Sequence, residues 1–208
     1  MTSPTARIVA AGYDRLADAY LDRFGLSAVR QRWLNRLAAA LPKKGGRVLD
    51  LGCGAGIPVA RDLAMLGHYV IGIDGSPEQI ARARRNVPGA CFAVADMCDV
   101  RFERATFDAV GAFYSISHVV AAKQPKLIAH VAEWLRPGGV FVASFGAGPA
   151  GEWTGEWLGA EMFFSHAGEA ASLAQLRDAG LVVRESAVER QDNEEIDFLW
   201  IAAVKPQG

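Results

Sequence analysis

The alternation of apolar and polar positions from residue 47 onward is the first organised feature of this chain. Short, almost wholly apolar runs are typical of strands: "RVLDL" (47–51), "YVIGID" (69–74), "ACFAVAD" (90–96), "FDAVGAF" (107–113) and "VFVASF" (140–145). Helical patterns separate several of them, at residues 58–66, 77–86 and 124–136. Strands this apolar are expected where helices cover both faces of a parallel sheet. The pattern predicts a doubly wound, Rossmann-like α/β fold.

Helix boundaries are marked by specific residues. Gly67 follows the first of these helices at its C-cap. Ser76 is the expected N-cap of the second, with Pro77 at the first helical position and Gln79 completing a capping box. The "PGG" at residues 137–139 is expected to stop the third helix.

The two ends of the chain depart from simple alternation. Residues 8–41 carry two helical patterns, and in the first of them Tyr13, Leu16, Tyr20 and Phe24 share one face. After a predicted helix at 167–179, two apolar runs are joined only by the polar turn "ERQDNEE". A parallel crossover needs about a dozen residues or more. We therefore expect an antiparallel pair at the end of a seven-stranded sheet.

These elements fit a single domain. Its expected parts are an N-terminal helical cap (1–44), a core (45–145), an insertion (146–166), and a final helix and hairpin (167–208).

Composition excludes several classes of function but does not indicate one. The 208 residues carry a formal net charge of −1, so no polyanion-binding surface is expected. "RARR" at residues 82–85 is interpreted as a solvated helix face. Three cysteines without paired metal-ligand spacing predict no metal site and favour a reduced, cytoplasmic setting. No apolar window approaches the roughly 18 residues of a membrane span, and the N-terminus is a poor signal peptide.

The chemistry is concentrated in a glycine-rich loop after the first strand. It reads Gly52-Cys53-Gly54-Ala55-Gly56-Ile57, and a dinucleotide fingerprint would place its third glycine where Ile57 stands. Asp50, just before the loop, can pair with an ammonium group, while the helix N-terminus behind the loop favours an anion such as a carboxylate. An α-amino acid group fits both. The alternative is that Asp50 only fixes the loop's own amides.

Two more acidic residues end the next strands. Asp74 is placed to accept two ribose hydroxyls at the carboxyl edge of the sheet. Asp96 can receive the exocyclic amine of adenine. Amino acid, ribose and adenine together describe S-adenosylmethionine. Each acid also has a plain alternative, as a capping or solvated turn residue.

With these residues in view, the sequence resembles the class I S-adenosylmethionine-dependent methyltransferases, most of all their small-molecule branch. "VLDLGCGAG", the acidic Asp74, "AD" at 95–96, "FDAVGAFYSISHV" and "LRPGGVFVAS" carry the likeness over residues 45–145. It implies that "YDRLADAY" is an N-terminal lid. The likeness also implies a set of cofactor-binding residues, to which we add Cys53 of the loop and Gly75 beside Asp74. The full set is Tyr13, Tyr20, Asp50, Gly52, Cys53, Gly54, Asp74, Gly75, Asp96, Met97, Phe113 and Tyr114.

Methyl transfer needs alignment and exclusion of water, and a base only when the acceptor is protonated. His118, just after the fourth strand, is the first candidate for a base or an acceptor-orienting group; the alternative is a polar group that satisfies its loop. His166 is the second candidate, with a capping role as its alternative. His68 and His130 are expected to be structural.

The insertion at residues 146–166 is expected to bind the acceptor. It is long for a connection and carries the aromatic residues Trp153, Trp157, Phe163 and Phe164. They favour a small, apolar or aromatic acceptor over a polymer, unless they only anchor the insertion to the sheet edge. A nucleic-acid methyltransferase and a non-catalytic cofactor-binding module remain as alternatives. An NAD-dependent oxidoreductase is disfavoured by the glycine spacing. No nucleic-acid or membrane partner is expected.

Overall fold

The computed structural model describes residues 3–24, 27–192 and 195–207. A seven-stranded sheet in the order β3-β2-β1-β4-β5-β9-β8 forms its centre. Its strands are β1 (Arg47–Leu51), β2 (Tyr69–Asp74), β3 (Cys91–Val94), β4 (Phe107–Ala112), β5 (Leu135–Gly146), β8 (Val182–Arg190) and β9 (Asp197–Val204). The first five are parallel, and β9 runs antiparallel to both β5 and β8. The predicted Rossmann-like sheet with an antiparallel end is confirmed. Two residues of the predicted polar turn, 193 and 194, lie outside the described residues.

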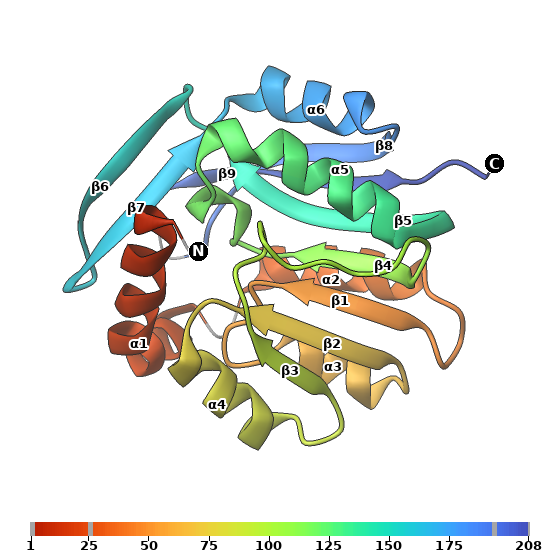
Figure 1. The fold of residues 1–208 in the computed structure, drawn as a ribbon, viewed down its shortest axis with the longest axis horizontal. Helices are drawn as coiled ribbons and strands as arrows, with labels where there is room; N and C mark the ends of the chain where they lie inside the picture. The colour runs from red at the N-terminus through yellow and green to blue at the C-terminus, as the bar shows by residue number, and fades with distance from the viewer. Residues whose placement is uncertain (1–2, 25–26, 193–194, 208) are drawn as a thin grey trace.

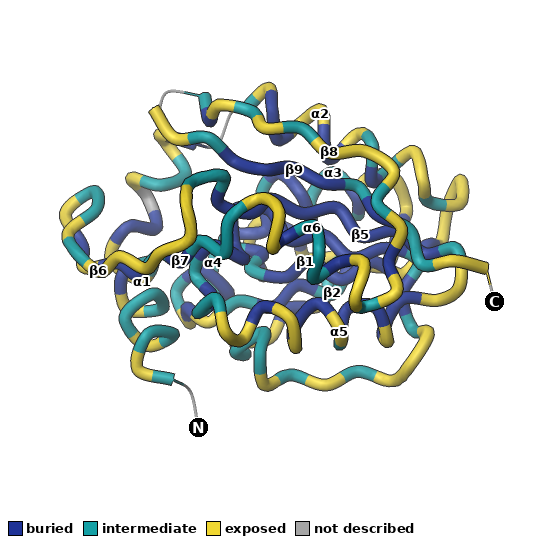
Figure 2. Tube along the Cα trace, turned by 90° about the horizontal axis from the view of Figure 1, so that it is seen from above, coloured by how far each residue is buried: buried dark blue, intermediate teal, exposed yellow. Residues whose placement is uncertain are grey.

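Helices cover both faces of the sheet (Figure 1). They are α1 (Pro4–Phe24), α2 (Ala28–Ala39), α3 (Val59–Met65), α4 (Pro77–Asn86), α5 (Gln124–Trp134) and α6 (Glu169–Asp178), with short 3-10 turns at Ile116–His118 and Ala121–Lys123. Apolar side chains of α2, α3 and α4 pack into one core, and those of α5 and α6 into another. Figure 2 shows the central strands as the most buried part of the trace.

α1 crosses the carboxyl edge of the parallel strands, toward which β1, β2 and β4 point in Figure 1. Asp14 accepts a hydrogen bond of 2.5 Å from the Ser76 hydroxyl, and the Tyr13 carbonyl accepts one of 3.4 Å from the Gln79 side chain. The predicted N-cap at Ser76 is confirmed, because its Oγ accepts the Gln79 amide. The other half of the predicted capping box, in which the Gln79 side chain would accept the Ser76 amide, is wrong. The Gln79 side chain instead donates to the Tyr13 carbonyl of α1.

The insertion is a β-hairpin rather than an irregular loop. β6 (Gly151–Trp157) and β7 (Ala160–His166) form a separate two-stranded sheet, with Trp153 opposite Phe164. The tip residues Leu158 and Gly159 both have positive φ, of 53° and 86°. Hairpins of this length favour such a turn, but a leucine there gives no sequence signal for it. Figure 2 shows much of β6 as exposed.

Two further findings limit the setting. In residues 3–24, 27–192 and 195–207, no helix is long and apolar enough to cross a membrane. Cys53, Cys91 and Cys98 are all free thiols. The cytoplasmic setting stays a prediction from the cysteine pattern.

Candidate active site

Two adjoining cavities lie beneath α1 at the carboxyl edge of the sheet. The first has about 900 Å³ of free space, partly open to solvent. Eleven of the twelve predicted cofactor residues line it: Tyr13, Tyr20, Asp50, Gly52, Cys53, Gly54, Asp74, Gly75, Met97, Phe113 and Tyr114. The second, with about 980 Å³ of free space that is also partly open to solvent, lies under the β6–β7 hairpin. Tyr13, Tyr20, Tyr114 and His118 line both cavities and so form the wall between them.

The glycine loop is held by its own backbone and by a close neighbour. Gly52 has a φ of +73°, and a Cβ there would lie 2.4 Å from the Ser115 Cβ. The Ser115 hydroxyl donates to the Leu51 carbonyl at 2.7 Å. Only glycine therefore fits at position 52, for its backbone angle and for the space.

Asp50 is buried at the base of the first cavity. No described group within hydrogen-bonding distance partners its Oδ2. Burial, and then the charge of Asp74, raise the pKa of Asp50 to about 7, although Arg30 acts in the opposite direction. A buried carboxylate without a donor is unfavourable, so the position is suited to a cationic group of a ligand. The alternative role of Asp50, as an anchor for the loop amides, finds no support at this oxygen.

Asp74 accepts hydrogen bonds from the backbone of the glycine loop and of the turn that follows β2. Its Oδ2 accepts the Gly54 amide and its Oδ1 accepts the Ser76 amide, each at 2.9 Å. Burial raises the pKa of Asp74, while these two amides counteract the shift. Each carboxylate oxygen can accept more than one hydrogen bond. Asp74 can therefore hold the loop and still accept ribose hydroxyls.

Asp96 is the one predicted cofactor residue that does not line either cavity. Its Oδ1 accepts the Cys98 amide at 2.9 Å, which is the role of a turn residue. The neighbouring Met97 does line the first cavity.

Arg30 of α2 was missed by the sequence analysis. It is 5% exposed and lines the first cavity. Its guanidinium donates to the Phe24 carbonyl and lies 5.8 Å from the centre of the Tyr114 ring. Arg32 and Arg36, on the same helix, form surface ion pairs instead. Nothing in "AVRQRWLNR" distinguishes the buried arginine from its exposed neighbours. Which arginine is buried depends on how α2 packs at the sheet edge.

His118 has a defined tautomer in this structure. Its Nδ1 lies 2.8 Å from the Phe163 carbonyl oxygen, which only accepts, so Nδ1 carries the proton. Nε2 then accepts the hydrogen bond from the Tyr13 hydroxyl, at 2.9 Å. Burial lowers the pKa of His118 to about 4 and raises the pKa of Tyr13. Both groups are neutral near pH 7.

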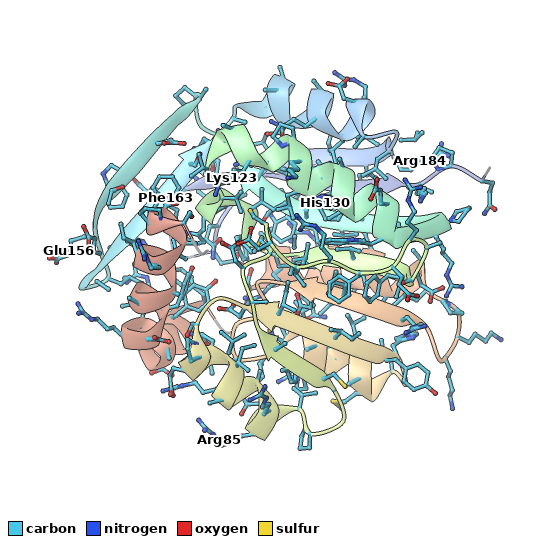
Figure 3. The ribbon with its side chains drawn as sticks, viewed as in Figure 1. Arg85, Lys123, His130, Glu156, Phe163 and Arg184 are labelled. Carbon is cyan, nitrogen blue, oxygen red and sulfur yellow. The ribbon has the colours of Figure 1, made fainter. Side chains whose placement is uncertain are left out.

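The hairpin's aromatic residues divide between its two faces. Trp153, Trp157 and Phe164 line the second cavity, and the Phe164 ring lies 4.7 Å from that of His118. Phe163 is buried and does not line it, as alternation along a strand requires. Figure 3 labels Phe163 on β7, beside α1. Phe163 is thus placed for the anchoring role that was the alternative for all four.

His166 lies away from the wall between the cavities. It lines the second cavity, but its ring packs against the backbone of Gly146, where a Cβ would come within 2.5 Å of it. Burial lowers the pKa of His166. Of the two predicted catalytic histidines, only His118 faces both cavities.

Comparison with known proteins identifies the fold's family. Residues 48–139 match the family model described as a methyltransferase domain. The chain is 32% identical to the 27-O-demethylrifamycin SV methyltransferase of Amycolatopsis mediterranei over 160 residues, which are 67% of this chain and 58% of that protein. The chain belongs to the class I S-adenosylmethionine-dependent methyltransferases.

Other members of the family agree in fold and differ in length. A ubiquinone biosynthesis O-methyltransferase from Methylocella silvestris is 36% identical over 114 residues, 51% of this chain and 42% of that protein. The chain thus spans about half the length of these curated relatives. The solved Burkholderia thailandensis 1,6-didemethyltoxoflavin-N1-methyltransferase, with 1,6-didemethyltoxoflavin and S-adenosylhomocysteine bound, has a TM-score of 0.74 at 21% identity, covering 95% of this chain and 85% of that one.

The first cavity of this methyltransferase domain fits the family's cofactor. S-adenosylmethionine carries an ammonium, a carboxylate and a ribose diol. The unpartnered Asp50 oxygen, the buried Arg30 and the Asp74 carboxylate offer a complementary charge or acceptor for each. Among the residues that the structure describes, no group of three or more His, Cys, Asp or Glu side chains could hold a metal ion.

Proposed function

We propose that this protein transfers the methyl group of S-adenosylmethionine to a small, neutral, largely apolar or aromatic acceptor bound under the β6–β7 hairpin. One observation carries the proposal: a cavity that contains the charged side chains Arg30, Asp50 and Asp74 adjoins an apolar, aromatic cavity. The wall that the two share is formed by Tyr13, Tyr20, Tyr114 and His118. A cofactor in the first cavity can present its methyl group to an acceptor in the second.

The cofactor side is assigned residue by residue. Asp50 binds the ammonium group and Arg30 the carboxylate of the methionine part. Asp74 accepts the ribose hydroxyls, while Gly52, Gly54 and Gly75 allow the backbone to come close. Met97 contacts the adenine, and Asp96 keeps the Met97 turn in place through the Cys98 amide. These roles follow from the lining of the cavity and from the family's cofactor.

The acceptor side has little chemistry to perform beyond placement. The sulfonium group, when bound, makes the methyl carbon electrophilic. The chain must hold the nucleophile in line with it and exclude water, which supplies several kcal/mol of barrier reduction. Tyr13, Tyr114 and the hairpin aromatics close the site to solvent.

His118 is assigned to orientation of the acceptor. The lone pair on Nε2 at the wall between the cavities can receive a hydrogen bond from the nucleophile's own hydroxyl or amine when that group displaces the Tyr13 hydroxyl. With a pKa of about 4, His118 is poorly matched to hold that proton near pH 7. His118 therefore takes up the nucleophile's proton only transiently during the transfer and releases it to solvent when the methylated product leaves and the site opens.

The experiment is a methyl-transfer screen with labelled S-adenosylmethionine. Purified protein is incubated with a panel of neutral aromatic phenols and amines, and with charged and aliphatic compounds of similar size. We expect labelled product only with neutral aromatic members. Protein that binds S-adenosylmethionine but methylates only charged acceptors would contradict the acceptor assignment. A failure to bind the cofactor would contradict the whole proposal.

A further inference from the structure

The second cavity contains two buried polar side chains among its apolar ones. Ser117 is 2% exposed and Gln191 is 6% exposed, and both line the cavity. Neither the Ser117 Oγ nor the Gln191 Oε1 has a hydrogen-bond partner within the described part of the chain. Buried polar groups are nearly always paired in folded proteins. The Tyr114 hydroxyl, on the wall shared with the first cavity, is unpaired as well. Three unpaired groups in one cavity indicate that the missing partners belong to what the cavity binds.

The topology places Ser117 and Gln191 at opposite ends of the cavity. Ser117 lies in the 3-10 turn that follows β4, next to His118. Gln191 follows β8 directly, and its backbone pairs with Ile196 ahead of β9. Because β9 runs antiparallel to both β5 and β8, β8 ends at the same sheet edge as β4 and β5. Two strands, β5 and β9, lie between β4 and β8, so the ends of β4 and β8 are about 14 Å apart at roughly 4.8 Å per strand.

The space between these two groups is lined mainly by apolar and aromatic side chains. Trp153, Trp157 and Phe164 of the hairpin, together with Tyr114 and Phe198, form its walls. The Tyr114 and Phe198 rings meet edge to face, with centroids 4.9 Å apart. Aromatic walls favour an aromatic ligand, which can stack on such rings or meet them edge to face.

The described residues that line the second cavity offer no carboxylate, ammonium or guanidinium group to bind an ionic acceptor. Among the described residues that line the second cavity there is no Asp, Glu, Lys or Arg. Its two histidines both have a lowered pKa because of burial, and His118 falls to about 4. Burying an unpaired charge beside them would be strongly unfavourable.

We propose that Gln191 binds a second polar group of the acceptor, so that the acceptor is a neutral, elongated aromatic molecule with a polar group at each end. The reacting group lies at the Ser117–His118 end, beside the cofactor cavity. The distal group donates a hydrogen bond to Oε1 of Gln191. Gln191 is in this way a specificity-determining residue. This inference rests on the proposed function, because it names the acceptor of the same site.

The test measures binding rather than turnover. Protein saturated with S-adenosylhomocysteine, which cannot donate a methyl group, is titrated calorimetrically with 2,6-dihydroxynaphthalene and with 6-methoxy-2-naphthol. The second probe has the same rings and one hydroxyl, but its other end cannot donate. We expect wild-type protein to bind the dihydroxy probe at least about tenfold more tightly, as one buried hydrogen bond provides.

Three variants make the result specific. Gln191→Met, of similar length, and Gln191→Leu should reduce the preference to less than about threefold while leaving the methoxy probe within about twofold of wild type. Ser117→Ala is the matched control at the other end of the cavity. It should weaken both probes alike and keep the preference. Thermal unfolding with S-adenosylhomocysteine confirms that each variant is folded.

Three results would overturn the inference: no preference in wild-type protein, a preference that survives both Gln191 variants, or no binding of either probe at about 1 mM. Methyl transfer to a non-aromatic acceptor by protein that binds neither probe would overturn this inference and leave methyl transfer itself intact. Loss of S-adenosylhomocysteine binding by wild-type protein would instead count against the proposed function.

Discussion

The Tyr13 hydroxyl donates a 2.9 Å hydrogen bond to Nε2 of His118, and this bond joins α1 to the turn after β4 at the wall between the two cavities. The two rings meet almost perpendicularly, at 89°. Because Nδ1 is held by the Phe163 carbonyl, the same imidazole also contacts the β6–β7 hairpin. Helix, sheet edge and hairpin therefore converge on one neutral side chain.

His118→Ala tests its role in placing the acceptor. We expect kcat/KM for the acceptor to fall roughly 10²-fold, with the cofactor Kd within about twofold. Tyr13→Phe is the matched variant, and it should keep kcat/KM within about fivefold because the acceptor's own donor replaces the phenol at Nε2. Steady-state kinetics with an acceptor that the protein methylates measure both variants. Equal losses in the two variants would show that the Tyr13–His118 bond itself is required.

The pH dependence of cofactor binding follows from Asp50. Its pKa is raised to about 7 by burial and by Asp74, so the group is increasingly protonated below that pH. Binding of an ammonium group requires the ionised form. We expect the affinity for S-adenosylmethionine to fall roughly tenfold for each pH unit below about 6.5, and to level off above about 7.5. Calorimetry in buffers of different ionisation enthalpy should also show proton release near pH 6. A flat profile from pH 5.5 to 8 would contradict the role of Asp50.

The same carboxyl group limits stability without cofactor. A folded pKa raised above the unfolded value means that its stability contribution is fully present below about pH 4 and is lost as pH rises through 7. We expect Asp50→Asn to be more stable than wild type by on the order of 4 kcal/mol at pH 8, and by only about 1 kcal/mol at pH 4.5. Urea unfolding without cofactor measures the difference. Loss of cofactor binding in this variant is the matching functional result.

Asp74 has a double role that two variants separate. Asp74→Ala removes the acceptor for the Gly54 and Ser76 amides as well as for the ribose, so we expect at least a tenfold loss of cofactor affinity and a lower Tm. Asp74→Asn keeps one acceptor oxygen and should lose less in both measurements. Calorimetric titration showing unchanged affinity in Asp74→Ala would contradict the ribose assignment.

Residues on the two faces of the β6–β7 hairpin provide its test. Phe164→Ala and Trp153→Ala open the second cavity, and we expect a higher KM for the acceptor with the cofactor Kd within about twofold. Phe163→Ala, on the buried side of the same strand, should instead cost about 3–5 kcal/mol of stability. Acceptor kinetics and urea unfolding distinguish the two results. A raised acceptor KM in Phe163→Ala alone would reverse the assignment of faces.

Most of the central sheet was predictable because each strand there is a nearly unbroken apolar run. The loop glycines and Asp74 were equally visible, since they stand at fixed offsets from strand ends. The helix at 124–136 was predicted two residues too long, and Leu135 begins β5 instead. There the sheet sets the boundary, because Leu135 pairs with Phe107 before the register shifts.

The acceptor side was less predictable because its residues meet only through tertiary structure. Gln191 is a polar residue within a polar turn, and Arg30 is one arginine among several on a helix. Their burial depends on which elements cover the sheet edge, and local sequence does not encode that. The hairpin was missed as a hairpin because Leu158 occupies a position with positive φ, where glycine or asparagine is the usual signal.

The separate pairing of β6 with β7 has a consequence for how this protein can diversify. Every ladder contact of β6 in the described sheets is to β7, and Glu156, labelled in Figure 3, lies near the tip of the hairpin, far from the central strands. Residues added at Leu158 and Gly159 would lengthen the hairpin without shifting the register of β5 or β9. Selection can therefore change the roof of one cavity while the glycine loop, Asp50 and Asp74 stay as they are. The range of acceptors can evolve independently of the methyl donor.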